Sequence, residues 1–181
     1  MWPNVKPGAA EAVWVRHAVH VAAHPEAAKC GDFVFRGLTF HSSEHAYQSE
    51  RWRRVDAAVA ESIRLQPTAL DAKKANTKAK VVWLKKIAKT GTTPEASGAL
   101  TVAEQIALMT EIVRAKFSQN LFLRAVLCST TNRGLHEQRG RSSNMWAFDP
   151  TVPAATSVAD RTDVLGVILT MVRAELAANP N

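Results

Sequence analysis

The chain has 181 residues, of which 46% are hydrophobic and 22% are charged, so it is long enough to bury a core and we expect a single globular domain. Its 23 lysines and arginines exceed its 16 acidic residues, and the formal charge is +7. No apolar run reaches the roughly 18 residues of a membrane-spanning helix, so membrane-spanning classes are excluded. The first ten residues have no apolar stretch either, so we expect no signal peptide and a cytoplasmic location, or a host-cell cytosol.

The first elements are short strands followed by a helix. Valines alternate with other residues over 13–21, which predicts a strand. The segments Phe-Val-Phe and Leu-Thr-Phe, joined at Arg36-Gly37, predict a hairpin with glycine in its turn. Ser42 or Ser43 can cap a helix that begins next, and Glu44 would then lie in the first turn, where a negative charge suits the helix dipole.

The remaining elements are mostly helices, and the fold class we expect is α+β, mainly helical, with a few short N-terminal strands. Apolar periodicity and turn residues predict helices at 55–65, 68–86, 102–117, 120–128 and 163–177, a loop at 90–98 and a long irregular segment at 129–162. The 55–65 helix carries an apolar stripe at Val55, Ala58, Val59, Ser62 and Ile63.

The stretch His41-Ser42-Ser43-Glu44-His45 contains His-x-x-Glu-His, which on a helix can hold zinc between two histidines. Here Phe40 ends a predicted strand and the two serines form a predicted cap, so His41 would precede the helix and could not stack one turn above His45. The other histidines supply no third-ligand motif. We therefore expect no metal, and His45 is predicted to be a packed or hydrogen-bonded core residue.

Four segments together resemble the NADAR, or YbiA-like, family: G-L-T-F-H-S-S-E-H-A-Y-Q (37–48), R-A-K-F-S-Q-N-L-F-L-R-A-V-L (114–127), L-H-E-Q through N-M-W (135–146) and D-V-L-G-V-I-L-T-M-V-R (163–173). The resemblance spans about residues 30–175. It implies one YbiA-like domain at 13–178 behind a flexible N-terminus at 1–12. It also implies a hydrolase that cleaves a ribosyl–base N-glycosidic bond without a cofactor. The substrates of the family include phosphoribosyl-pyrimidine intermediates of riboflavin synthesis and ADP-ribose on guanine in nucleic acid.

By this resemblance Glu44 is the acidic residue at the centre of the site. Cleavage of a ribosyl–nitrogen bond builds positive charge on the sugar, and a carboxylate beneath that carbon can stabilise the cation and activate water. Without the resemblance, Glu44 could be an ordinary first-turn glutamate. The candidate substrate-binding residues are Tyr47, Gln48, Arg51, Lys116, Asn120 and Trp146. Four of them have a structural alternative: a residue that satisfies a buried backbone group for Gln48, a solvated lysine for Lys116, a helix cap for Asn120 and a core tryptophan for Trp146.

The sequence departs from the family pattern where that pattern has an acid before Trp-Gly. Residues 140–147 contain no aspartate, Ala147 replaces the glycine, and Asp163 stands where the family has asparagine. Either Asp149 or Asp163 supplies the second catalytic carboxylate, or hydrolysis has been lost and a nucleotide- or ADP-ribose-binding module remains.

The charge leaves a third alternative, a general nucleic-acid-binding protein, because basic residues gather at 51–54 and 73–86. A well-charged solvated surface would explain the same clusters. The partner that the family resemblance implies is a phosphorylated ribosyl small molecule or ADP-ribosylated nucleic acid, and we expect no membrane. The oligomeric state stays open.

Overall fold

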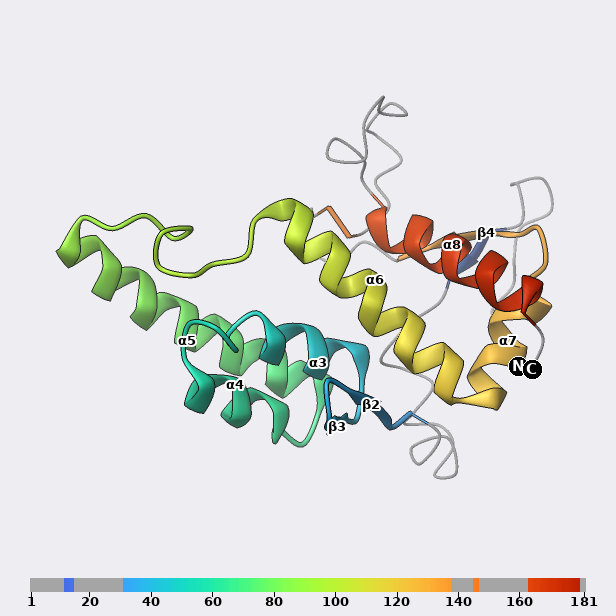
Figure 1. The fold of residues 1–181 in the computed structure, drawn as a ribbon, viewed down its shortest axis with the longest axis horizontal. Helices are drawn as coiled ribbons and strands as arrows, with labels where there is room; N and C mark the ends of the chain where they lie inside the picture. The colour runs from blue at the N-terminus through green and yellow to red at the C-terminus, as the bar shows by residue number, and fades with distance from the viewer. Residues whose placement is uncertain (1–11, 15–30, 138–144, 147–162, 180–181) are drawn as a thin grey trace.

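The computed structural model describes residues 12–14, 31–137, 145–146 and 163–179, and it is mainly helical with short strands (Figure 1). The elements in chain order are β1 (Ala12–Trp14), β2 (Phe33–Phe35), β3 (Leu38–Phe40), α3 (Ser43–Glu50), α4 (Ala57–Arg64), α5 (Ala69–Thr90), α6 (Val102–Gln119), α7 (Leu121–Ser129), β4 (Gly134–His136) and α8 (Val164–Ala178). This confirms the expected α+β class. Within the described ranges, none of the helices combines the length and apolarity that a membrane span requires.

The strands form two separate pairs. β1 lies parallel to β4, with Val13 opposite Leu135, and β2 pairs with β3 in the predicted antiparallel hairpin. The hairpin turn has positive φ at both central residues, 49° at Arg36 and 79° at Gly37, as a tight turn matched to the strand twist requires. The strand expected over 13–21 is present at 12–14, and its continuation lies outside the described residues.

The main core is formed by α6 and α8, which lie side by side, with the β2–β3 hairpin and α3 packed against α6 (Figure 1). Ile112 and Val113 of α6 and Leu169 and Val172 of α8 are fully buried. These residues recur at helical spacing, so the apolar periodicity that predicted both helices also marks their buried faces.

A smaller core joins α3, α4 and α5 around Trp52, Ala60, Ile63 and Ala72. The stripe predicted for α4 was wrong in part, because Ala58 and Ser62 are exposed while Ala60 is buried. The helix is capped by Asp56, whose carboxylate accepts hydrogen bonds from the Ala58 and Val59 amides. Its buried face is set by packing on Trp52 and Ala72, which the apolar pattern alone did not reveal.

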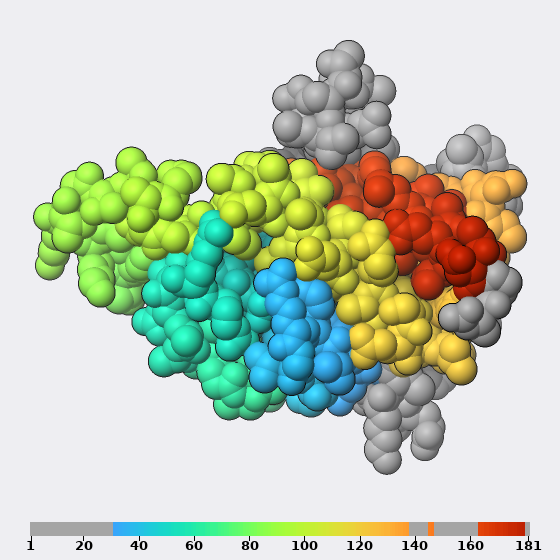
Figure 2. All heavy atoms as spheres, in the orientation of Figure 1, coloured from blue at the N-terminus to red at the C-terminus, as the bar shows by residue number. Residues whose placement is uncertain are grey.

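α5 is longer than predicted and projects from the body of the molecule (Figure 2). It is capped by Thr68 and ends at Gly91, which adopts the left-handed φ of 67° typical of a helix C-terminus. It packs against α3 and α4, and its last apolar anchors are Trp83, which lies edge-to-face with Trp52, and the buried Ile87.

A close contact fixes β4 against the start of α8. Gly166, in the first turn of α8, faces the carbonyl of Leu135 in β4 and the carboxylate of Asp163. A Cβ at Gly166 would lie 2.1 Å from the Leu135 oxygen and 2.6 Å from Asp163 Oδ2. Only glycine at position 166 therefore allows β4 and the start of α8 to pack this closely.

We expect Gly166→Ala to lower the free energy of unfolding by roughly 1–3 kcal/mol, because overpacking outweighs the better helix propensity of alanine. Urea unfolding followed by circular dichroism measures the change. Met171→Ala, at an exposed position of the same helix, is the control and should stay within about 0.5 kcal/mol of the wild type. An unchanged stability for Gly166→Ala would contradict this account of the close contact.

Candidate functional site

The start of α3 is held by a hydrogen-bonded histidine. Ser42 caps the helix, its Oγ accepting from the His45 amide and lying 2.8 Å from His45 Nδ1, while His45 Nε2 lies 2.9 Å from the carbonyl oxygen of Gln66. Burial lowers the pKa of His45. Both ring nitrogens are thus engaged by the protein, and the prediction of a buried, hydrogen-bonded His45 is confirmed.

His41 lies before α3, as expected, and its Nδ1 is 2.9 Å from the Asp32 carboxylate. Its ring is edge-on to His45 at 6.0 Å between centroids. Among the described residues no group of three histidines, cysteines or acids could hold a metal ion.

Glu44 is half-buried in the first turn of α3, where the helix N-terminus favours its negative charge. Gln48, one turn later and buried, donates from Nε2 to Glu44 Oε1 at 2.8 Å. Arg51 in turn donates to Gln48 Oε1 at 3.3 Å. One face of α3 therefore carries a chain of hydrogen bonds that orients the Glu44 carboxylate, as the spacing of these residues predicted.

Glu137, the residue after β4, lies within electrostatic range of Glu44. Burial, together with the charges of Glu44 and Asp163, raises the pKa of Glu137 to about 7, against the opposing charge of Lys73 in α5. Its buried Oε2 has no hydrogen-bond partner among the described residues. The sequence analysis did not select Glu137, although the Leu-His-Glu-Gln motif contained it.

Asp163, one of the two candidates for a second carboxylate, lies next to Glu137 and holds it in place. It precedes α8 with a left-handed φ of 83°, and its Oδ2 lies 2.5 Å from His136 Nδ1. Its Oδ1 accepts the Glu137 amide at 3.1 Å. Both oxygens are thus engaged with β4. Asp149, the other candidate, lies outside the described residues.

Tyr47 and Trp146 form an aromatic pair beside Glu44. Their rings meet edge-to-face at 5.3 Å, and the Tyr47 hydroxyl donates to Gln105 Oε1 at 2.8 Å. Burial raises the pKa of Tyr47 to about 12. The Arg51 guanidinium lies 5.3 Å from the Tyr47 ring centre. Trp146 is held in turn by α8, because its carbonyl accepts the Leu165 amide.

Two other predicted substrate-binding residues stand apart from this cluster. Asn120 caps α7, its Oδ1 accepting the Leu123 amide at 2.9 Å, which is the structural alternative considered for it. Lys116 is only 7% exposed, so it is no solvated lysine, and burial lowers its pKa to about 8. No hydrogen bond or ion pair within the described part of the chain joins Lys116 to Glu44 or Glu137.

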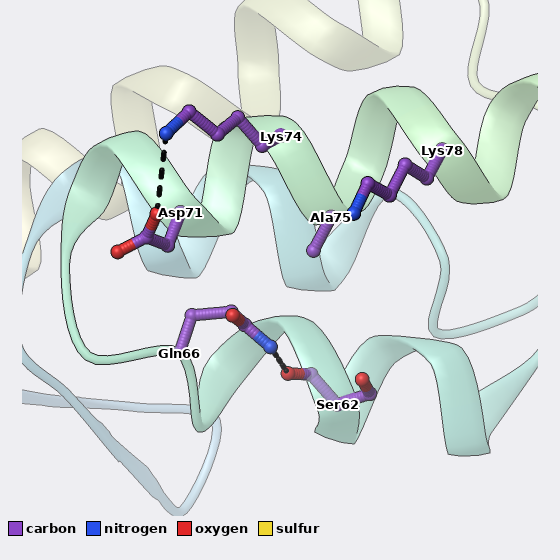
Figure 3. Close-up of a pocket in the computed structure, with 6 residues that line it drawn as sticks. All are labelled: Ser62, Gln66, Asp71, Lys74, Ala75 and Lys78. Carbon is purple, nitrogen blue, oxygen red and sulfur yellow. Dashed lines mark hydrogen bonds and ion pairs between the residues drawn. The ribbon is translucent and has the colours of Figure 1, made fainter.

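A groove open to solvent lies elsewhere, between α4 and α5 (Figure 3). It is lined by Ser62, Gln66, Asp71, Lys74, Ala75 and Lys78. None of these residues comes from α3 or β4. Asp71 is the single acid among them, so the groove has no pair of carboxyl groups like Glu44 and Glu137. The candidate catalytic site is therefore the acidic cluster at α3, β4 and α8, and the groove is a separate surface.

Comparison with known proteins bears on both the fold and the motifs. The structure resembles the NMR structure of the Escherichia coli protein YbiA, with a TM-score of 0.62 and 19% sequence identity over 93% of this chain and 86% of that one. No curated protein matches the sequence. The family model described as the NADAR domain matches residues 9–177. The chain therefore belongs to the NADAR family.

Proposed function

We propose that this protein hydrolyses a ribosyl–base N-glycosidic bond at the Glu44–Glu137 cluster. The observation that carries the proposal is the pairing of two carboxyl groups in unlike environments. Glu44 is half-buried and held by Gln48, whereas Glu137 is more deeply desolvated, with its pKa raised to about 7. Such a pair divides acid and base roles between its members at neutral pH.

The roles follow from these environments. Glu44, as the carboxylate, stabilises the positive charge that develops on the ribose and takes a proton from the attacking water. Glu137, when protonated, donates its proton to the departing base nitrogen. The C–N bond breaks, the water oxygen bonds to the ribose carbon, and each carboxyl group ends in the opposite protonation state. Exchange with solvent then restores both. No cofactor is needed for these steps.

The residues around the pair suit a phosphorylated ribosyl substrate. Tyr47 and Trp146 offer aromatic surface for a base, and Arg51 has guanidinium donors left for a phosphate or ribose oxygen. Lys116 and Asn120 remain proposals for substrate contact. The substrate class is a phosphorylated ribosyl small molecule or ADP-ribose on guanine in nucleic acid, acted on in the cytoplasm.

A non-catalytic nucleotide- or ADP-ribose-binding module is the second candidate. It is favoured by the absence of an aspartate from residues 140–147, where the family pattern has one. Binding measured by calorimetry without product by mass spectrometry would support this candidate over the enzyme.

We expect Glu44→Gln to lower turnover by about 10²-fold or more, because acid–base assistance alone contributes about 10²–10⁴. The assay measures release of the sugar from a DNA oligonucleotide carrying ADP-ribosylated guanine and from a phosphoribosyl-aminopyrimidine. Binding of the uncleaved substrate should persist. Glu95→Gln, which removes an exposed glutamate from the α5–α6 loop, is the control and should retain full turnover. Unimpaired turnover in Glu44→Gln would refute the proposed role.

Asp163→Asn should move the alkaline limb of the pH–rate profile to lower pH. A protonated Glu137 is required, so the rate falls as pH rises through its pKa of about 7. The charge of Asp163 raises that pKa, and removing the charge lowers it. The asparagine oxygen can still accept the Glu137 amide. A lower rate with an unmoved limb would show that Asp163 has only a structural role.

A further inference from the structure

The positive charge of the protein is concentrated on one helix. α5 contains seven lysines and a single acid, Asp71, so it carries a net +6 against a formal +7 for the whole chain. The lysines are Lys73, Lys74, Lys78, Lys80, Lys85, Lys86 and Lys89, and all seven are exposed. The rest of the sequence is therefore close to electrically neutral.

The structure separates these lysines from the other cations. Five arginines are neutralised by acids: Arg36 and Arg53 by Glu50, Arg54 by Glu104, Arg64 by Glu61 and Arg114 by Glu175. On α5 only Lys74 forms an ion pair within the described residues, with 3.5 Å between its Nζ and Asp71 Oδ1. An exposed ion pair of this length contributes little to stability, and an external anion can readily replace Asp71 as the partner of Lys74.

Four of the lysines form a straight stripe. Lys74, Lys78, Lys85 and Lys89 are spaced by four, seven and four positions, which places them on one side of a helix with 3.6 residues per turn. The stripe is about 22 Å long at 1.5 Å per residue. It starts at the α4–α5 groove, which Lys74 and Lys78 line, and runs to the projecting end of α5 (Figures 2 and 3).

We propose that this stripe binds the phosphate backbone of nucleic acid. An extended row of uncompensated cations matches the regular charge of a polynucleotide better than the few charges of a small ligand. α5 has one aromatic residue, Trp83, and it is packed against Trp52, so α5 offers no ring for stacking bases. Contact with phosphates alone predicts binding that is independent of sequence and sensitive to salt.

The stripe is distinct from the Glu44–Glu137 cluster, so this inference does not depend on glycosidase activity. One lysine of the same helix, Lys73, acts electrostatically on Glu137. α5 therefore extends from the candidate catalytic site to the outer end of the stripe, and a bound strand could reach that site.

The test is fluorescence-anisotropy titration of the full chain with a labelled DNA duplex of mixed sequence at several salt concentrations. We expect the wild type to bind with a steep salt dependence. Lys85→Gln/Lys89→Gln should bind at least several-fold more weakly, and its log–log salt slope should be smaller by about 2. Arg64→Gln/Arg114→Gln removes the same charge from paired arginines elsewhere and should bind like the wild type. Circular dichroism establishes that both variants fold.

Absence of duplex binding by the wild type at low salt would overturn the inference. An equal loss in both double variants would also overturn it, because it would mean that total charge, and not the stripe, governs binding. Glu44→Gln should bind the duplex normally. An inactive protein that binds through Lys85 and Lys89 would refute the proposed enzyme alone, whereas a protein with activity but unaffected by the lysine changes would refute the stripe alone.

Discussion

The carboxylate of Asp163 is the contact on which the candidate site depends. Its Oδ2 is hydrogen-bonded to His136 Nδ1 and its Oδ1 accepts the Glu137 amide. These two contacts hold the end of β4 against the start of α8. Without the Asp163 carboxylate the backbone that carries Glu137 would lose its hydrogen bond to the start of α8. The left-handed backbone at Asp163 and the missing side chain at Gly166 are the local requirements that let this link form.

The same link has an electrostatic consequence. It brings a third acid close to Glu44 and Glu137, and like charges in a desolvated place cannot all remain ionised. Glu137 is the member whose pKa is raised by desolvation and whose Oε2 has no hydrogen-bond partner among the described residues, so it accepts the proton. Two glutamates, Glu44 and Glu137, therefore differ in their environment although they are of the same residue type.

Much of the fold could be predicted because its signals are local. Helical periodicity gave α6 and α8, the serine cap gave α3, and the Arg36-Gly37 turn gave the hairpin. The face of α3 from Glu44 to Arg51 was predictable for the same reason. Glu137 was missed because its burial and its neighbours come from α3, α5 and α8, and spacing along the chain contains none of these contacts. The burial of Lys116 is likewise a tertiary effect, since a lysine among helical polar residues is usually solvated.

The site draws on α3, from the first part of the chain, and on the corner between β4 and α8, from its last part. Contacts between segments this far apart in the sequence form slowly during folding. The chain loses conformational entropy as the segments approach, before their contact contributes any stabilisation. A chain still on the ribosome could form the α3–α4–α5 subdomain and yet would lack a second carboxyl group beside Glu44. The candidate site is therefore complete only after the final helix has been synthesised and has packed on α6.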